Sequence, residues 1–124
     1  MSWFLVTVMV ALGGAEPVAP MQPHAAVSAA LDKQAALVLI QQTLMAWPRA
    51  SAETRNLACV IMLRNLEAGG MRAYDGDAGH AKLLVEALAL RVCMDESAKA
   101  GVGIGVGEAA ALCILLMDAE EDAR

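Results

Sequence analysis

The sequence predicts an all-α protein, a four-helix bundle-like single domain preceded by an apolar N-terminal segment. Hydrophobic residues make up 58% of the 124 residues but aromatic residues only 3%, so the apolar excess comes from Ala, Leu, Val and Met. Ala and Leu are strong helix formers, and Met fills irregular gaps between packed helices. A chain of this length fits one domain and can bury a core of its own.

The apolar N-terminal segment, residues 1–15, has two interpretations. Its stretch 3–12 is too short for a membrane-spanning helix, which needs about 20 residues. It could be the core of a secretory signal with small residues at 13–15, although no Lys or Arg precedes it, or it could be a first core element or short strand. The protein is accordingly cytoplasmic or exported. A Pro-rich linker at 16–23 then leads into a helical domain over 24–124.

Capping and breaking residues set the expected helix boundaries. Pro48 disfavours helix at the residue before it and should end the first helix. Ser51 and Asp77 are suitable N-caps for the second and third helices, because their side-chain oxygens accept hydrogen bonds from first-turn amides. Glycines end the second helix and precede the fourth. The helices are therefore predicted over residues 24–47, between Ser51 and Gly69, and over residues 78–96 and 108–121.

Three of these helices are apolar on every face in their middle, at residues 35–40, 57–63 and 109–117. The first of these stretches is expected in the interior, since a surface helix keeps a continuous polar face. Each helix of a four-helix bundle leaves one side to solvent, so a monomer would expose large apolar side chains at 57–63 and 109–117. We therefore expect a homo-oligomer or a protein partner, unless the N-terminal segment covers this surface.

Charge argues against nucleic acid as a partner. The formal net charge is −5, acidic residues gather at the C-terminus, and the nine Lys and Arg residues are scattered singly. Nucleic-acid-binding domains usually carry a basic face, whereas an acidic tail more often solvates a chain end. We expect no nucleic-acid binding and no membrane-spanning segment.

The three cysteines, Cys59, Cys93 and Cys113, lie in apolar helical stretches. An odd number of cysteines with long spacings and no CxxC pair does not indicate a disulfide framework. Buried thiols behave as small hydrophobic side chains with a raised pKa. The sequence therefore predicts three reduced cysteines that react slowly in the native protein.

A glycine-rich stretch at residues 101–107 invites a nucleotide-binding interpretation. Gly105, Gly107 and Ala110 match a loose GxGxxA spacing, in which glycines let a pyrophosphate approach a helix N-terminus. A true motif follows a strand in a βαβ unit, and the preceding residues 95–99 are polar. A helix–helix connector or a short Gly-Val extended strand is the preferred interpretation.

The polar loop at residues 71–80 carries the remaining candidates for chemistry. Asp75, Asp77 and Glu86 faintly resemble a calcium loop, but Gly79 and His80 stand where a ligand and a glycine are needed. The two aspartates could form an acid–base pair, but turn formation and helix capping are the preferred interpretation of both. His24 and His80 share no metal-ligand spacing. We predict no catalytic, cofactor-binding or metal-ligating residues, and no cofactor.

These observations favour a non-enzymatic binding or assembly protein acting through a helix-lined hydrophobic surface. The alternative is an exported small helical protein of the cell envelope, or of inhibitor or immunity type, which the signal-like start would support. The third possibility is a small enzyme with its site in the loop at residues 71–80, the one polar, Gly-rich segment able to shape a pocket.

Overall fold

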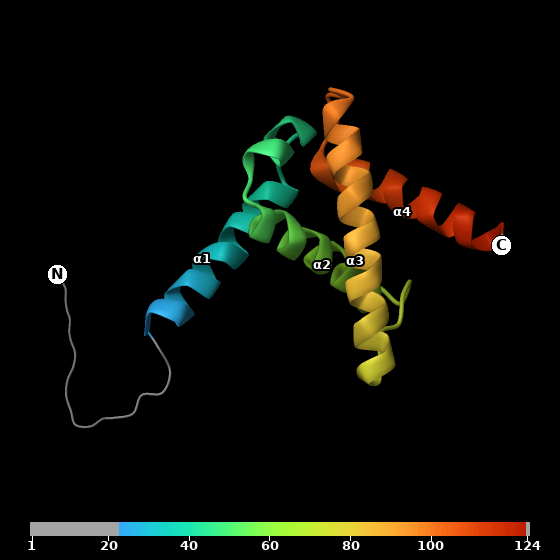
Figure 1. Cartoon of the computed structure of the whole chain (residues 1–124), viewed down its shortest axis with the longest axis horizontal. Coiled ribbons are helices and arrows are strands. Elements are labelled where there is room, and N and C mark those ends of the chain that lie inside the picture. The colour runs from blue at the N-terminus through green and yellow to red at the C-terminus, as the bar shows by residue number, and fades with distance from the viewer. Residues whose placement is uncertain (1–22, 124) are drawn as a thin grey trace. The chain divides into compact units, whose positions relative to one another are not determined.

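The computed structural model describes residues 23–123, so the expectations for residues 1–15 and for nearly all of the linker lie outside the described residues. The chain divides into two units at Ala30, and the packing below is that of the unit beginning at Leu31. Within residues 23–123 every element is helical, as predicted (Figure 1). They are α1 (Pro23–Ile40), the 3-10 helix η1 (Leu44–Arg49), α2 (Ala52–Ala68), α3 (Gly76–Lys99) and α4 (Val106–Asp122).

The predicted end of the first helix is wrong. Helix α1 ends at Ile40 instead of continuing to Pro48, which lies inside η1. The cause is a pairing with the glycine-rich stretch, because Thr43 and Gly105 form an isolated antiparallel bridge. The amide of Leu44 donates to the carbonyl of Ile104 at 2.7 Å, and extended backbone with such a partner cannot continue a helix.

Of the two predicted N-caps, one is confirmed and one is displaced. The Ser51 side chain accepts a hydrogen bond from the amide of Thr54 at 3.1 Å. Helix α3 begins at Gly76, so Asp77 lies in its first turn, where a carboxylate interacts favourably with the helix dipole. The start of α3 lies very close to the preceding chain, since a Cβ atom on Gly79 would be 2.2 Å from the carbonyl carbon of Tyr74. Only glycine fits there.

Helix α3 is the central element of the core (Figure 1). Its four buried residues recur at helical spacing and form one stripe. This stripe meets side chains from η1, α2 and α4, all of them apolar. The α3 stripe is Leu83, Ala87, Leu90 and Met94, and its neighbours include Leu44, Trp47, Cys59, Leu63, Val106, Ala109 and Cys113.

The three apolar helix centres differ in how far they are exposed to solvent. In α2, residues 57–63 are all buried or half-buried, so the expectation that they are exposed is wrong. The helix is covered by α3 along one side, and the aromatic ring of Tyr74 packs near its C-terminal end. In α1 the expected burial of residues 35–40 is wrong for Ala35, Leu37 and Val38, which are exposed because only a narrow stripe of the helix joins the core. In α4, exposure within residues 109–117 is confirmed.

A disulfide between Cys93 of α3 and Cys113 of α4 corrects the prediction of three reduced cysteines. The two residues are 20 positions apart, and only the packing of α3 against α4 brings them together. Cys59 remains a free, buried thiol. Burial, with a smaller contribution from the charge of Asp95, raises its pKa to about 12, so it stays protonated as the sequence predicted.

Removing the disulfide should lower the free energy of unfolding by about 3 kcal/mol, because the bridge restricts a loop of 20 residues in the unfolded chain. We expect this loss for the double substitution Cys93→Ala and Cys113→Ala, measured by urea unfolding without reductant. Adding reductant should destabilise the wild-type protein and leave the double variant unchanged. Alkylation of unfolded, unreduced protein should modify one thiol, and modification of three would contradict the pairing.

Candidate functional site

The outer faces of α3 and α4 carry large hydrophobic side chains that the described chain does not cover. Leu88 of α3 and Leu115 of α4 are 64% and 65% exposed. Both helices therefore have one apolar face in the core and a second apolar face on the surface. The exposed sets are Leu84, Val85, Leu88 and Val92 on α3, and Leu112, Leu115 and Leu116 on α4.

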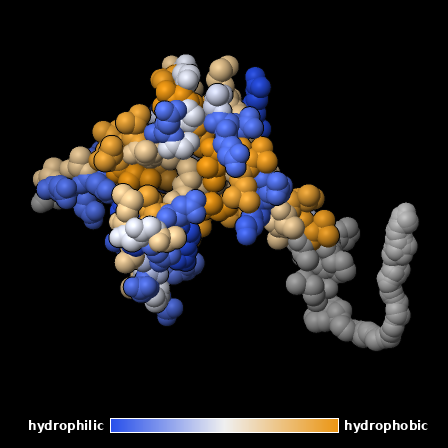
Figure 2. All heavy atoms as spheres, turned by 180° about the vertical axis from the view of Figure 1, so that it is seen from behind, coloured by the Kyte–Doolittle hydropathy of each residue, from blue (hydrophilic) through white to orange (hydrophobic). Residues whose placement is uncertain are grey.

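Hydrophobic residues also reach the surface on the side turned away in Figure 1, where they lie among hydrophilic residues (Figure 2). Such surface is a feature of interaction sites when it forms contiguous patches. Within the described residues, no helix is both long enough and apolar enough to cross a membrane.

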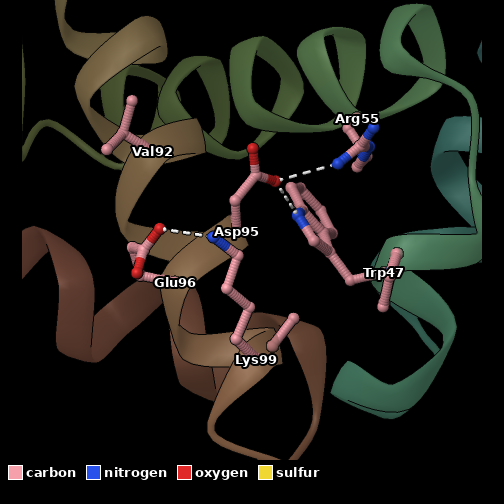
Figure 3. Close-up of a pocket in the computed structure, with 8 residues that line it drawn as sticks. Trp47, Arg55, Val92, Asp95, Glu96 and Lys99 are labelled. Atoms are coloured by element: carbon pink, nitrogen blue, oxygen red, sulfur yellow. Dashed lines mark hydrogen bonds and ion pairs between the residues drawn. The ribbon is translucent and has the colours of Figure 1, made fainter.

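The carboxylate of Asp95 joins three elements beside a hollow of about 360 Å³ (Figure 3). Trp47 of η1 donates its indole N–H to Oδ1 of Asp95 at 2.7 Å, and Nη1 of Arg55 from α2 lies 3.1 Å from the same oxygen. Nε of Arg91, one turn earlier on α3, is 3.4 Å from Oδ2. Because both oxygens are engaged by donors, this carboxylate serves to position helices and is not a free base.

A second polar cluster joins the loop at residues 70–75 to α3 and α4. Arg72 pairs with Asp118 at 2.7 Å and lies 3.5 Å from Glu86. The hydroxyl of Tyr74 donates to Oε1 of Glu86 at 2.6 Å. Burial, followed by the hydrogen bond to Glu86 and the charge of that residue, raises the pKa of Tyr74 above its ordinary value. The phenol is therefore neutral at physiological pH and acts as a donor.

The calcium-loop interpretation does not fit the structure. Asp77 and Glu86 both lie in α3, nine residues apart, which corresponds to about 13 Å along the helix axis. One ion cannot bind both carboxylates directly at that distance. His80 is exposed on α3, and the side chain of His24 lies outside the described residues. Where side chains are described, no group of three or more His, Cys, Asp or Glu residues could hold a metal.

The glycine-rich stretch forms a connector and one isolated bridge, with no βαβ unit around it. Gly105 occupies the N-cap position of α4, and its amide donates to Oε1 of Glu108 at 2.9 Å. The chain's own carboxylate therefore lies where a phosphate would approach a nucleotide-binding helix. This arrangement supports the connector interpretation.

Sequence reasoning missed the two polar clusters because their members come from distant segments. Arg55 and Asp95 are 40 positions apart, and Arg72 and Asp118 are 46 apart. The local signals were the four-residue spacings of Arg91 and Asp95 and of Lys82 and Glu86, which favour pairs on one helix face.

Replacing Asp95 by Asn should lower the free energy of unfolding by about 2 kcal/mol, because an amide can still accept from Trp47 but cannot neutralise two arginines. The matched control is Glu96→Gln, the next residue on α3, whose ion pair with Lys99 is exposed. The control should change stability by less than about 0.5 kcal/mol. Equal effects of both substitutions in urea unfolding would contradict the role of Asp95.

The single tyrosine of the chain should titrate above the ordinary value of about 10. Since the pKa of Tyr74 is raised in the folded state, the associated stability is complete below about pH 10 and is lost as the pH rises through the folded-state pKa. Absorbance of tyrosinate against pH measures this, with the protein in guanidinium as the unfolded reference. Glu86→Gln should move the midpoint toward the reference, and coincident native and unfolded midpoints would contradict the assignment.

Comparison with known proteins yields no match: no protein-family model, no curated protein and no solved structure matches the chain. The two strongest features of the chain are the exposed apolar faces of α3 and α4 and the joining of those helices by a disulfide.

Proposed function

We propose that the protein is a non-enzymatic binding or assembly protein that acts through the exposed apolar faces of α3 and α4. The observation that carries this proposal is the double-faced character of both helices, each apolar toward the core and again toward solvent. Fully burying one Leu or Val side chain stabilises by about 1.5–3 kcal/mol. Several such residues on one helix give a partner a substantial gross gain, part of which the entropy of association offsets.

Four titratable groups in the core and in the two polar clusters have internal roles, which supports binding over catalysis. Asp95 and Glu86 are held by donors from other elements, and burial raises the pKa values of Cys59 and Tyr74. A catalytic base or nucleophile usually has a pKa shifted toward neutral pH, whereas the pKa values of Cys59 and Tyr74 are shifted away from it. In the segment considered for a small enzyme, Arg72 and Tyr74 are used for internal contacts, whereas Asp75, Asp77 and His80 are exposed.

A second candidate is an exported small helical protein of the cell envelope, or of inhibitor or immunity type. The specific observation in its favour is the Cys93–Cys113 disulfide, since such bonds form and persist mainly in oxidising compartments. Export and a binding role are compatible. The intact mass of protein from its native host tests this candidate, which predicts removal of residues 1–15 together with an oxidised pair. A retained N-terminus with three free thiols would contradict it.

The binding proposal is tested with one charged substitution on each apolar face, Leu88→Asp and Leu115→Asp. Both residues are largely exposed, so each variant should fold with nearly unchanged stability. We expect at least one variant to lose self-association or a partner that the wild-type protein retains, measured by light scattering and by affinity capture with quantitative mass spectrometry. Glu120→Gln, an exposed substitution in the last turns of α4, is the control. Indistinguishable behaviour of all four proteins would contradict the proposal.

A further inference from the structure

The outer face of α3 has a symmetric arrangement of charge and apolar side chains about Leu88. Asp77 lies eleven residues before Leu88 and Lys99 lies eleven residues after it. Eleven residues are very nearly three helical turns, so the three side chains project from the same side of the helix. Leu84 and Val92 lie four residues before and after Leu88 and continue the same ridge. All five side chains are exposed.

We infer that this face binds a second copy of the same chain, with the two α3 helices antiparallel and Leu88 on the two-fold axis. The inference rests on the proposed function and names the partner of one of its two faces. Two-fold pairing requires a self-complementary surface, in which each residue meets the one placed symmetrically on the other subunit. The arrangement around Leu88 meets that requirement in both apolar contact and charge.

The symmetric contacts can be followed outward from the axis. Leu88 meets the partner's Leu88, and Leu84 meets the partner's Val92. Seven residues from the axis, the small Ala81 faces the partner's Asp95, where Trp47 and Arg55 gather around the carboxylate. Because alanine is small, it leaves room for the side chains that surround Asp95. Val92 also borders the hollow beside Asp95, so the partner's Leu84 would lie at its edge (Figure 3).

Charge complementarity distinguishes a second copy from an unrelated apolar helix. About 16 Å from the axis on each side, Asp77 faces the partner's Lys99. Lys99 also forms an exposed ion pair with Glu96 of its own helix, which it would share with the partner's Asp77. A crossing angle near 20°, common for helices packed side by side, keeps both ends within reach of these side chains. A parallel arrangement would instead place Asp77 beside the partner's Asp77 and Lys99 beside the partner's Lys99. The charges therefore select the antiparallel pairing.

The expected dimer is weak and concentration-dependent. Stable interfaces bury about 800 Å² on each partner, more than one helix face provides. The apolar face of α4 takes no part in this pairing and remains open to another partner. Half-association in the micromolar to submillimolar range is therefore expected, and sedimentation equilibrium over that range measures it.

Charge reversal tests the geometry. Asp77→Lys or Lys99→Asp alone should weaken the dimer roughly tenfold, because each substitution creates two like-charge contacts by symmetry. The double variant Asp77→Lys/Lys99→Asp restores both contacts with opposite polarity and should recover most of the affinity. Glu120→Lys, on α4, is the matched control and should leave association unchanged. Single reversals without effect, or a double variant no better than the singles, would overturn the inference.

Cross-linking at the axis gives an independent measurement. With Cys59→Ala as background, Leu88→Cys should form an intermolecular disulfide under mild oxidation, whereas Leu115→Cys on α4 should not. Linkage through position 115 alone would overturn the α3 pairing and leave the proposed function in place. If the protein is a monomer and Leu88→Asp abolishes binding of a different protein, the α3 pairing is likewise overturned and the proposed function stands. A monomer with no partner affected by either apolar face would overturn both.

Discussion

Two hydrogen bonds, from Trp47 of η1 and Arg55 of α2, and an ion pair with Arg91 of α3 converge on Asp95, and the arrangement of the core depends on them. Trp47 is fully buried and donates its indole N–H to this carboxylate, so a polar contact joins η1 to α3 in addition to their apolar packing. Arg55 attaches α2 to the same carboxylate. The disulfide from Cys113 then attaches α4 to another side of α3. Every neighbour is thus joined to one helix, whose remaining face carries Leu84, Leu88 and Val92 to the surface.

Local signals in the sequence were sufficient for the fold class and for several boundaries. The helix formers, the Ser51 cap and the glycines after Ala68 act within a few residues, and the structure confirms them. The end of α1 could not be predicted, because it depends on Thr43 pairing with Gly105, which is remote in sequence. The disulfide was missed for the same reason, since spacing alone says nothing of which helix faces meet.

The exposed apolar face could be predicted from the sequence on α4 but not on α3. An uninterrupted apolar run at residues 109–117 must expose some side chains when one side of the helix faces solvent, and Leu112, Leu115 and Leu116 are those side chains. On α3 the outward leucines are interleaved with charged residues, so the segment resembles an ordinary amphipathic helix. The four-residue recurrence of Leu84, Leu88 and Val92 was the available signal, yet it lies beside a second, buried stripe. Only the packing of the helices against one another distinguishes the exposed stripe from the buried one.

Native-state hydrogen exchange tests most directly whether α3 is the element on which the core depends. If it is, the slowest amides of the protein should lie in α3, around Leu90 and Met94, which are fully buried. Amides of α1, whose residues are mostly exposed, should exchange much faster. Reducing the disulfide should accelerate exchange in α4 first. Exchange in the centre of α3 as fast as in α1 would contradict this account of the structure.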